Sequence, residues 1–356
     1  GNFAFQKDNQ LPPQNLVPET KQTIELGTEI DLFDGRVKLD ATWFKDKVED
    51  QLVQVPVPQS TGFTISLVNL GETETTGTEI SLSGDVVRTD GGLTWNTAFN
   101  YTQNEFKINE LAPGVERVTI GNGFNSVSVV GEVGTGFQLR ATDVLRDSIS
   151  GRPIIDPNTG LRQPGDPTNF GDIMPDFTLG WVNSVSYKGV TLRWTMEWRN
   201  GGKIRSATVN DLRDAGAVTE TLAGREGTLI DVAGVLENED GSFRDNDVPV
   251  RSTRDFWTNL DNNNVSGNAV FDGTFIKLRE VGLFYSLPSS IIGNTPFKRG
   301  VILGVEGRNL ALLYSKVPHI DPETGSLLGA GSDAFGIERQ SVPTTRSLGF
   351  NVKLNF

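Results

Sequence analysis

The feature that most constrains the fold is an alternation of apolar and polar side chains, which is clearest in the last thirteen residues, Thr344 to Phe356. The apolar positions of this segment are Leu348, Phe350, Val352, Leu354 and Phe356. A period of two residues is that of an extended strand with one face in an apolar environment and the other in water. A strand of a soluble β-sandwich could show the same alternation, so the remainder of the chain decides between the two.

The same alternation recurs upstream, giving about nine predicted strands in all. It is most regular in Phe177 to Tyr187 and in Val190 to Arg199. Only Lys188-Gly189 separates these two segments, which predicts a tight hairpin. In Thr274 to Leu287 the apolar positions change phase near Glu280, which predicts a β-bulge there.

The connections between the predicted strands alternate in length. The short ones are Phe33 to Arg36, Arg88 to Gly91 and Lys188-Gly189, with a moderate one at Pro288 to Lys298. The long ones are Asp50 to Glu72, Lys107 to Pro175, Asn200 to Gly273 and Leu313 to Pro343. Bacterial transmembrane barrels have short periplasmic turns and long extracellular loops. The order therefore predicts an all-β, antiparallel transmembrane β-barrel with the C-terminus on the periplasmic side.

Composition agrees with this class and excludes several others. No segment approaches the roughly eighteen consecutive apolar residues of a membrane helix. The chain has no cysteine, and His319 is its only histidine, which argues against thiolate metal sites and against a Ser-His-Asp triad. A net charge of -13 argues against nucleic acid as a partner. No catalytic constellation stands out, so we do not expect an enzyme.

Large aromatic residues lie near the ends of the apolar faces of the predicted strands. We interpret seven of them as a membrane aromatic belt, namely Trp43, Trp95, Tyr101, Trp181, Tyr187, Trp194 and Trp198. The alternative is that they are ordinary core aromatics.

About nine strands present a problem for closure, because bacterial barrels of this type have an even number of strands. An open sheet would present two bare edges within the membrane, which is not tolerated. We therefore expect residues 1–356 to be the C-terminal portion of a larger barrel, with further strands upstream of Gly1.

Several segments resemble the SusC/RagA family of TonB-dependent outer-membrane transporters, and they follow one another in the family's order. The segments are NLVPETKQTIELGTE (Asn15 to Glu29), LDATWFKDKVEDQLVQVPVPQSTGF (Leu39 to Phe63), VNLGETETTGTEISLSG (Val68 to Gly84), WRNGGKIRSAT (Trp198 to Thr208), DGTFIKLREVGLFYSLP (Asp272 to Pro288), GRNLALLYSKVPHIDPETG (Gly307 to Gly325) and SVPTTRSLGFNVKLNF (Ser341 to Phe356). Thr76 stands where the family more often has asparagine. The aromatic end also resembles the C-termini of outer-membrane barrels, which implies that Phe350, Val352, Leu354 and Phe356 form a C-terminal assembly signal.

The resemblance implies a barrel of about 22 strands with a plug domain in its lumen. The plug, the segment that contacts TonB and the earlier strands would then precede Gly1. It also implies residence in the outer membrane, a SusD-like surface lipoprotein as a lid, and TonB-driven import of oligosaccharides or peptides. The open alternative is a non-transporting structural, adhesive or scaffold barrel within a surface complex. A soluble β-rich enzyme or lectin is a third, less favoured interpretation.

Two groups of residues are candidates for function. The lumen-facing or plug-facing charges considered first are Arg193, Glu197, Arg199, Glu306 and Arg308, and the same alternation assigns Glu25, Glu29, Glu79, Asp85 and Lys277 to the lumen. We expect them to contact the plug or solvent, with direct ligand contact as the alternative. The long-loop aromatics expected to contact the lid or a ligand are Phe124, Phe137, Phe170, Phe256 and Trp257, with packing within the loops as the alternative.

We expect no cofactor. Acidic clusters at Glu237 to Asp247 and Ile320 to Gly325 offer oxygen ligands suited to calcium, although the first lacks the spacing of an EF-hand loop. The segment Ile204 to Glu220 is expected to form a short surface helix that breaks at Gly216.

Overall fold

The computed structural model describes residues 9–13, 16–57, 59–69, 71–112, 114–122, 126–226, 232–250, 252–262, 265–293, 297, 299–324 and 336–355. Within these residues, nine strands form one large antiparallel sheet in the order β2-β3-β6-β7-β12-β13-β18-β19-β21. The strands are β2 Thr20–Leu32, β3 Val37–Glu49, β6 Gly71–Arg88, β7 Thr94–Leu111, β12 Phe177–Tyr187, β13 Val190–Asn200, β18 Phe275–Ser286, β19 Gly300–Ser315 and β21 Ser347–Asn355. Each strand pairs with its neighbours in chain order, as expected of an up-and-down sheet. The all-β, antiparallel prediction is confirmed.

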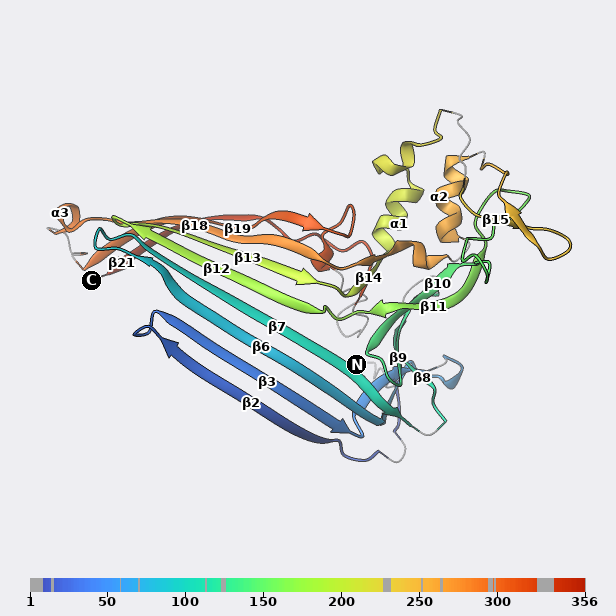
Figure 1. Cartoon of the computed structure of the whole chain (residues 1–356), viewed down its shortest axis with the longest axis horizontal. Helices are drawn as coiled ribbons and strands as arrows, with labels where there is room; N and C mark the ends of the chain where they lie inside the picture. Colours follow the sequence, from blue (N-terminus) through green and yellow to red (C-terminus); the bar gives the residue numbers. More distant parts are fainter. Residues whose placement is uncertain are drawn as a thin grey trace, which may run out of the picture.

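Short turns join the strands at one end of the sheet (Figure 1). Between β12 and β13 the turn consists of Lys188 at φ 47° and Gly189 at φ 85°. Positive φ at both central residues gives a turn whose twist matches that of the paired strands. The predicted hairpin is confirmed, with Tyr187 opposite Val190. A one-turn helix, α3 (Ser289–Ile292), lies at this same end in the β18–β19 connection (Figure 1).

Long connections gather at the opposite end and carry their own secondary structure (Figure 1). A four-stranded sheet contains β8 Arg117–Asn122, β9 Ser128–Glu132, β10 Phe137–Val144 and β11 Pro164–Asp172. Smaller sheets contain β1 Gln10–Leu11, β4 Leu52–Pro56 and β5 Ile65–Asn69; β14 Lys203–Ser206, β17 Val270–Asp272 and β20 Ile337–Glu338; and β15 Val235–Glu237 with β16 Phe243–Asp245. The helices are α1 Ala207–Asp214, α2 Thr253–Asn262 and the 3-10 turns η1 Gln59–Thr61, η2 Thr219–Leu222, η3 Ser266–Ala269 and η4 Pro322–Thr324. The helix expected from Ile204 is thus shorter, and Gly216 with φ 66° follows its end.

The large sheet has an apolar face and a polar face, as the alternation predicts. The apolar face carries large side chains in contact with solvent, among them Leu26 at 67% exposed and Phe350 at 70%. Soluble monomers rarely expose a continuous apolar surface of this extent. Near the long connections this face ends in charges, where Lys45 lies 2.9 Å from Glu74 and Lys47 lies 2.8 Å from Glu72.

The buried core of the molecule lies in the long connections rather than under the large sheet. One cluster contains Val129, Leu139 and Ile173, with Phe137 and Phe170 packed against it. The connections therefore form a packed body that caps one end of the sheet. Within the described residues, no helix has the length and apolar composition needed to cross a membrane.

The predicted bulge lies in β18. The register shifts between Leu278 and Glu280 on both sides of the strand, so Arg279 is the extra residue. The bulge keeps Leu278 and Val281 on the apolar face, since they pair with Met196 and Trp194 of β13. It also turns Arg279 and Glu280 together toward the polar face, where both find ionic partners.

Candidate functional site

A cavity of about 500 Å³ lies where the polar face meets the long connections. We call it the mouth cavity. Its lining residues come from strands β12, β13 and β14, and from the β11–β12, β13–β14, β17–β18 and β19–β21 connections. Those used below are Met174, Glu197, Arg199, Lys203, Pro322 and Glu323.

A network of ion pairs closes one side of the mouth cavity. Arg279 lies 2.6 Å from Glu197 of β13 and 2.7 Å from Glu323 of η4. Lys277 lies 2.6 Å from both Asp321 and Glu323. The network ties the β19–β21 connection to the inside of the sheet, and its two basic members come from the bulged part of β18.

The pKa values of the two loop carboxyls reflect this network. Hydrogen bonds from Arg279 and Lys277 outweigh burial and lower the pKa of Glu323. Burial alone would raise the pKa of Asp321, but hydrogen bonds from Lys277 and Thr344 outweigh it and lower that pKa as well. Both carboxylates are therefore held in the charged form that the network requires.

The predicted lumen-facing charges all lie on the polar face. Arg193 lies over the ring of Phe284, with its guanidinium carbon 5.4 Å from the ring centre. Glu306 accepts a hydrogen bond of 3.1 Å from Arg308, which also lies 3.5 Å from Glu280. Glu197 joins the network above. These five do not converge, because only Glu197 and Arg199 line the mouth cavity.

Two of the predicted loop aromatics are packed within the loops. Phe137 contacts Phe106, with ring centres 4.5 Å apart, and belongs to two apolar clusters. Phe170 covers Gly267, where a Cβ would come within 2.2 Å of its ring. These contacts correspond to the alternative role, packing within the loops, and contact with a lid or ligand stays a prediction. Phe124 lies outside the described residues.

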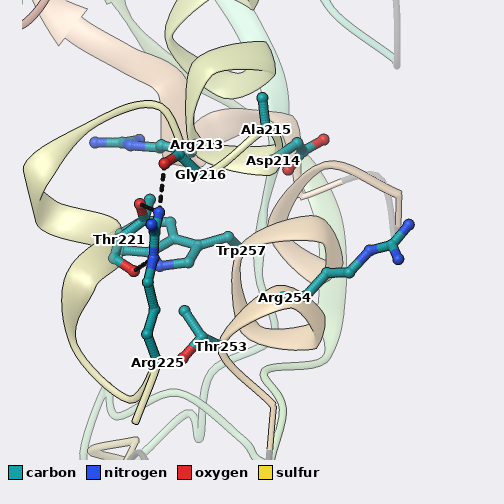
Figure 2. A pocket seen from close by; sticks show the side chains of 9 residues that line it. All are labelled: Arg213, Asp214, Ala215, Gly216, Thr221, Arg225, Thr253, Arg254 and Trp257. Carbon is teal, nitrogen blue, oxygen red and sulfur yellow. Dashed lines mark hydrogen bonds between the residues drawn. The ribbon is translucent and has the colours of Figure 1, made fainter.

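Phe256 and Trp257 lie on α2. Phe256 packs against the cluster of Ile155, Val232, Leu236 and Val250. Trp257 lines a separate pocket of about 270 Å³ between α1, η2 and α2 (Figure 2). Arg213 lies over its ring at 5.4 Å and pairs with Glu220 at 2.5 Å.

Two of the three arginines that line this second pocket, Arg213 and Arg225, are already engaged with the protein. Arg225 donates to the carbonyl of Gly216 and, at 2.6 Å, to the hydroxyl of Thr221, as Figure 2 shows. Arg254 points away from Trp257 (Figure 2). The bonds of Arg213 and Arg225 therefore stabilise the loop and leave few donors for a ligand. We place the candidate site at the mouth cavity instead.

The acidic loop segments contain no cluster of three or more metal-ligating side chains within the described residues. Asp240 accepts hydrogen bonds from the backbone and side chain of Ser242, and Asp247 lies 2.6 Å from Arg244. Asp321 is held by Lys277. Calcium binding in these loops stays a prediction.

Residues 2–216 match the model of the family described as TonB dependent receptor-like, beta-barrel. The chain belongs to this TonB-dependent receptor β-barrel family. It is 28% identical to TonB-dependent receptor P3 of Formosa agariphila over 95% of the chain and 34% of that protein. It is also 28% identical to TonB-dependent receptor P26 of the same organism, over 96% of the chain and 35% of that protein. The chain thus spans about a third of the length of these curated relatives.

Solved structures agree on the fold. The chain superposes on a chain of the RagAB peptide transporter with a TM-score of 0.69, 18% identity, and coverage of 95% of this chain and 35% of that one. The RagAB peptide importer in its closed-closed state gives a TM-score of 0.67. The predicted SusC/RagA-type identity is confirmed.

The exposed apolar face of the large sheet is suited to contact with lipid, which agrees with membership of a TonB-dependent receptor β-barrel family. All seven predicted belt aromatics lie on strands of the large sheet with their side chains on that face. Trp43, Tyr187 and Trp198 are exposed, whereas the others pack across neighbouring strands, as in the stacked pair Phe99–Trp181. Membership of an interfacial belt stays a prediction.

The C-terminal strand β21 carries the apolar pattern from which the prediction began. Phe350, Val352 and Leu354 lie on the apolar face and are exposed, with Phe350 opposite Val305 of β19. Their role as an assembly signal is untested, and Phe356 lies outside the described residues.

Proposed function

We propose that the chain is the C-terminal portion of a TonB-dependent outer-membrane importer. In this proposal residues 1–356 supply the last nine strands of a barrel of about 22 strands with a plug in its lumen. The short turns lie on the periplasmic side and the long connections outside the cell. The apolar face meets lipid, and the polar face meets the plug and the transport path.

One observation carries this proposal. The nine-stranded sheet has an apolar face that is exposed from β2 to β21, and within the described residues each of these edge strands has only one partner. A bare sheet edge in hydrocarbon would leave backbone groups unpaired at several kcal/mol each. Further strands of the same barrel would remove both edges at once.

The proposed partners are a SusD-like lipoprotein above the mouth and the TonB complex below the plug. The RagAB structures, described as a peptide importer in open and closed states, support the pairing with a lid. The proposed cargo is an oligosaccharide or a peptide that enters under the lid and first meets the long connections. In this proposal Phe256 and Trp257 of α2 contact the lid.

Uptake in the source bacterium tests the proposal. Deleting the gene is expected to abolish uptake of the cognate oligosaccharide or peptide mixture, and dissipating the proton gradient is expected to stop uptake in the wild type. Uptake that continues unchanged in the deletion strain would contradict import and favour a non-transporting scaffold barrel.

A further inference from the structure

Two basic side chains of the mouth cavity, Arg199 and Lys203, form no ion pair with any described residue, although the charges of Glu197 and Glu323 attract Arg199 without direct contact. Nε of Arg199 is buried and makes no hydrogen bond within the described structure. Lys203, four residues further along, forms no ion pair with any described residue; its aliphatic stem lies over Gly171, where a Cβ would come within 3.2 Å of it. A buried cationic donor without an acceptor costs free energy, so its retention calls for an explanation.

The neighbouring carboxylates do not fill this role. Glu197 is bound by Arg279 at 2.6 Å, and Glu323 is bound by both Lys277 and Arg279. Four basic side chains, Arg199, Lys203, Lys277 and Arg279, thus face three carboxylates, Glu197, Asp321 and Glu323.

Part of the wall is apolar. Met174, Ile173, Ile204 and Pro322 line the mouth cavity beside Arg199 and Lys203. Ile173 and Met174 also line a second cavity of about 510 Å³, whose other walls include Leu52, Val53, Ile120, Val129 and Phe137. The mouth cavity, which holds Arg199 and Lys203, and a mainly apolar cavity therefore adjoin across a single two-residue segment.

We propose that the mouth cavity binds a carboxylate of the transported ligand through Arg199 and Lys203, while the ligand's apolar part enters the adjoining cavity. This rests on the proposed import function and deepens it. A guanidinium binds a planar carboxylate through paired hydrogen bonds, and such charge-assisted bonds are about twice as strong as neutral ones. The carboxylate belongs either to a peptide C-terminus or to a uronate sugar.

Binding to the intact receptor, purified in detergent, tests the site. One pair of probes is N-acetyl-leucine and N-acetyl-leucinamide, and the other is trigalacturonate and its methyl ester. Each acid is expected to bind about tenfold more tightly than its uncharged counterpart. A preference confined to the first pair identifies the peptide terminus as the source, and one confined to the second identifies the uronate.

Variants assign the preference to residues. Arg199→Gln and Lys203→Gln are each expected to reduce the preference for the acid severalfold, and together to abolish it. Neither side chain forms an ion pair with a described residue, and the carboxylates that attract Arg199, Glu197 and Glu323, keep their contacts with Arg279 and Lys277 in both variants. Arg193→Gln, on the same face of the same strand but outside the cavity, serves as the matched control and is expected to retain the preference.

The inference is overturned if the wild type binds the acid and the uncharged probe equally well, or binds neither at millimolar concentration. It is also overturned if the double variant keeps the full preference for the acid. Uptake measured in bacteria that carry the wild-type or the variant receptor separates failure of the carboxylate site from failure of the proposed import function. Uptake that is TonB-dependent but indifferent to both variants refutes the carboxylate site alone, whereas absence of uptake in the wild type refutes import.

Discussion

The ammonium of Lys277 lies 2.6 Å from a carboxylate oxygen of Asp321, and this contact fixes the last long connection to the inside of the sheet. Lys277 is also 2.6 Å from Glu323 and is buried. A buried charge that loses its partners is costly, so the three side chains hold one another in place. The connection between β19 and β21 is thereby tied to one wall of the mouth cavity.

Replacing Lys277 with methionine is expected to free this connection. Asp321 and Glu323 would lose their hydrogen bonds from Lys277, and we expect a local loss of about 1–3 kcal/mol. The measurement is the rate of tryptic cleavage after Lys316 in the folded receptor, which should rise. Lys45→Met removes an ion pair with Glu74 on the apolar face and should leave that rate unchanged. Equal cleavage in Lys277→Met and wild type would show that the network does not hold the connection.

The same connection is expected to loosen in acid. The pKa values of Asp321 and Glu323, which lie outside the membrane-spanning strands, are lowered in the folded protein. A lowered pKa means stabilisation that is present above the ordinary value, about 4, and is lost as the pH falls below it. Hydrogen exchange of residues 316–324, corrected for its intrinsic pH dependence, should accelerate below about pH 4. Constant protection from pH 7 to pH 3 would contradict this.

Gly77 of β6 is expected to resist substitution because an aromatic ring occupies the space above it. A Cβ at this position would lie 2.2 Å from the ring of Phe44 on β3. Gly77→Ala should therefore cost about 1–3 kcal/mol, and Phe44→Leu in the same chain should restore part of the loss. The measurement is the midpoint of heat-induced loss of the compact form on gels.

Gly27 of β2 provides the control for that experiment. A Cβ there would come no closer than 3.3 Å to Thr42, and its φ is not in the left-handed region. Gly27→Ala should shift the midpoint little. If Gly77→Ala behaves like Gly27→Ala, the ring of Phe44 does not set the requirement for glycine in the TTGTE segment.

The large sheet could be predicted from the sequence because its signal is local. Phe177–Tyr187 was delimited by alternation alone, and the phase change in β18 located the bulge near Glu280. The period of two depends only on which neighbours face lipid or water. The four-stranded sheet β8 to β11 was not predicted, because its strands are short and buried within a long connection and their pairing depends on tertiary contacts.

The candidate site was predicted only in part, for the same reason. Alternation assigns Glu197 and Arg199 to the polar face. It does not place them beside Glu323, which lies far away in the chain, or beside Lys203, which begins the separate strand β14. Alternation does not assign Arg279 to the polar face, because the bulge places two consecutive residues, Arg279 and Glu280, on that face. Its pairing with Glu323, 44 residues away, leaves no trace in the spacing of the sequence.

Asn183 is a polar residue on the apolar face that alternation does not explain, and its hydrogen bonds are expected to stabilise the sheet there. It is 1% exposed, and its carbonyl oxygen accepts hydrogen bonds from Trp95 at 3.1 Å and from Thr97 at 3.0 Å. Trp181 donates in turn to Thr97 at 2.8 Å. Two polar groups of the apolar face thus donate to one amide oxygen, and a third donates to Thr97; a leucine at position 183 could not accept the first two hydrogen bonds.

Asn183→Leu should therefore destabilise the folded protein by about 1–3 kcal/mol, although it places a more apolar residue on the apolar face. Trp95→Phe removes one donor, and the double variant should cost less than the sum of the two, by about 0.5–3 kcal/mol, because the lost interaction is shared. The heat-induced gel shift measures all three. If the free-energy losses of the two single variants simply add in the double variant, or if Asn183→Leu is more stable than the wild type, the hydrogen bonds of Asn183 do not determine its effect on stability.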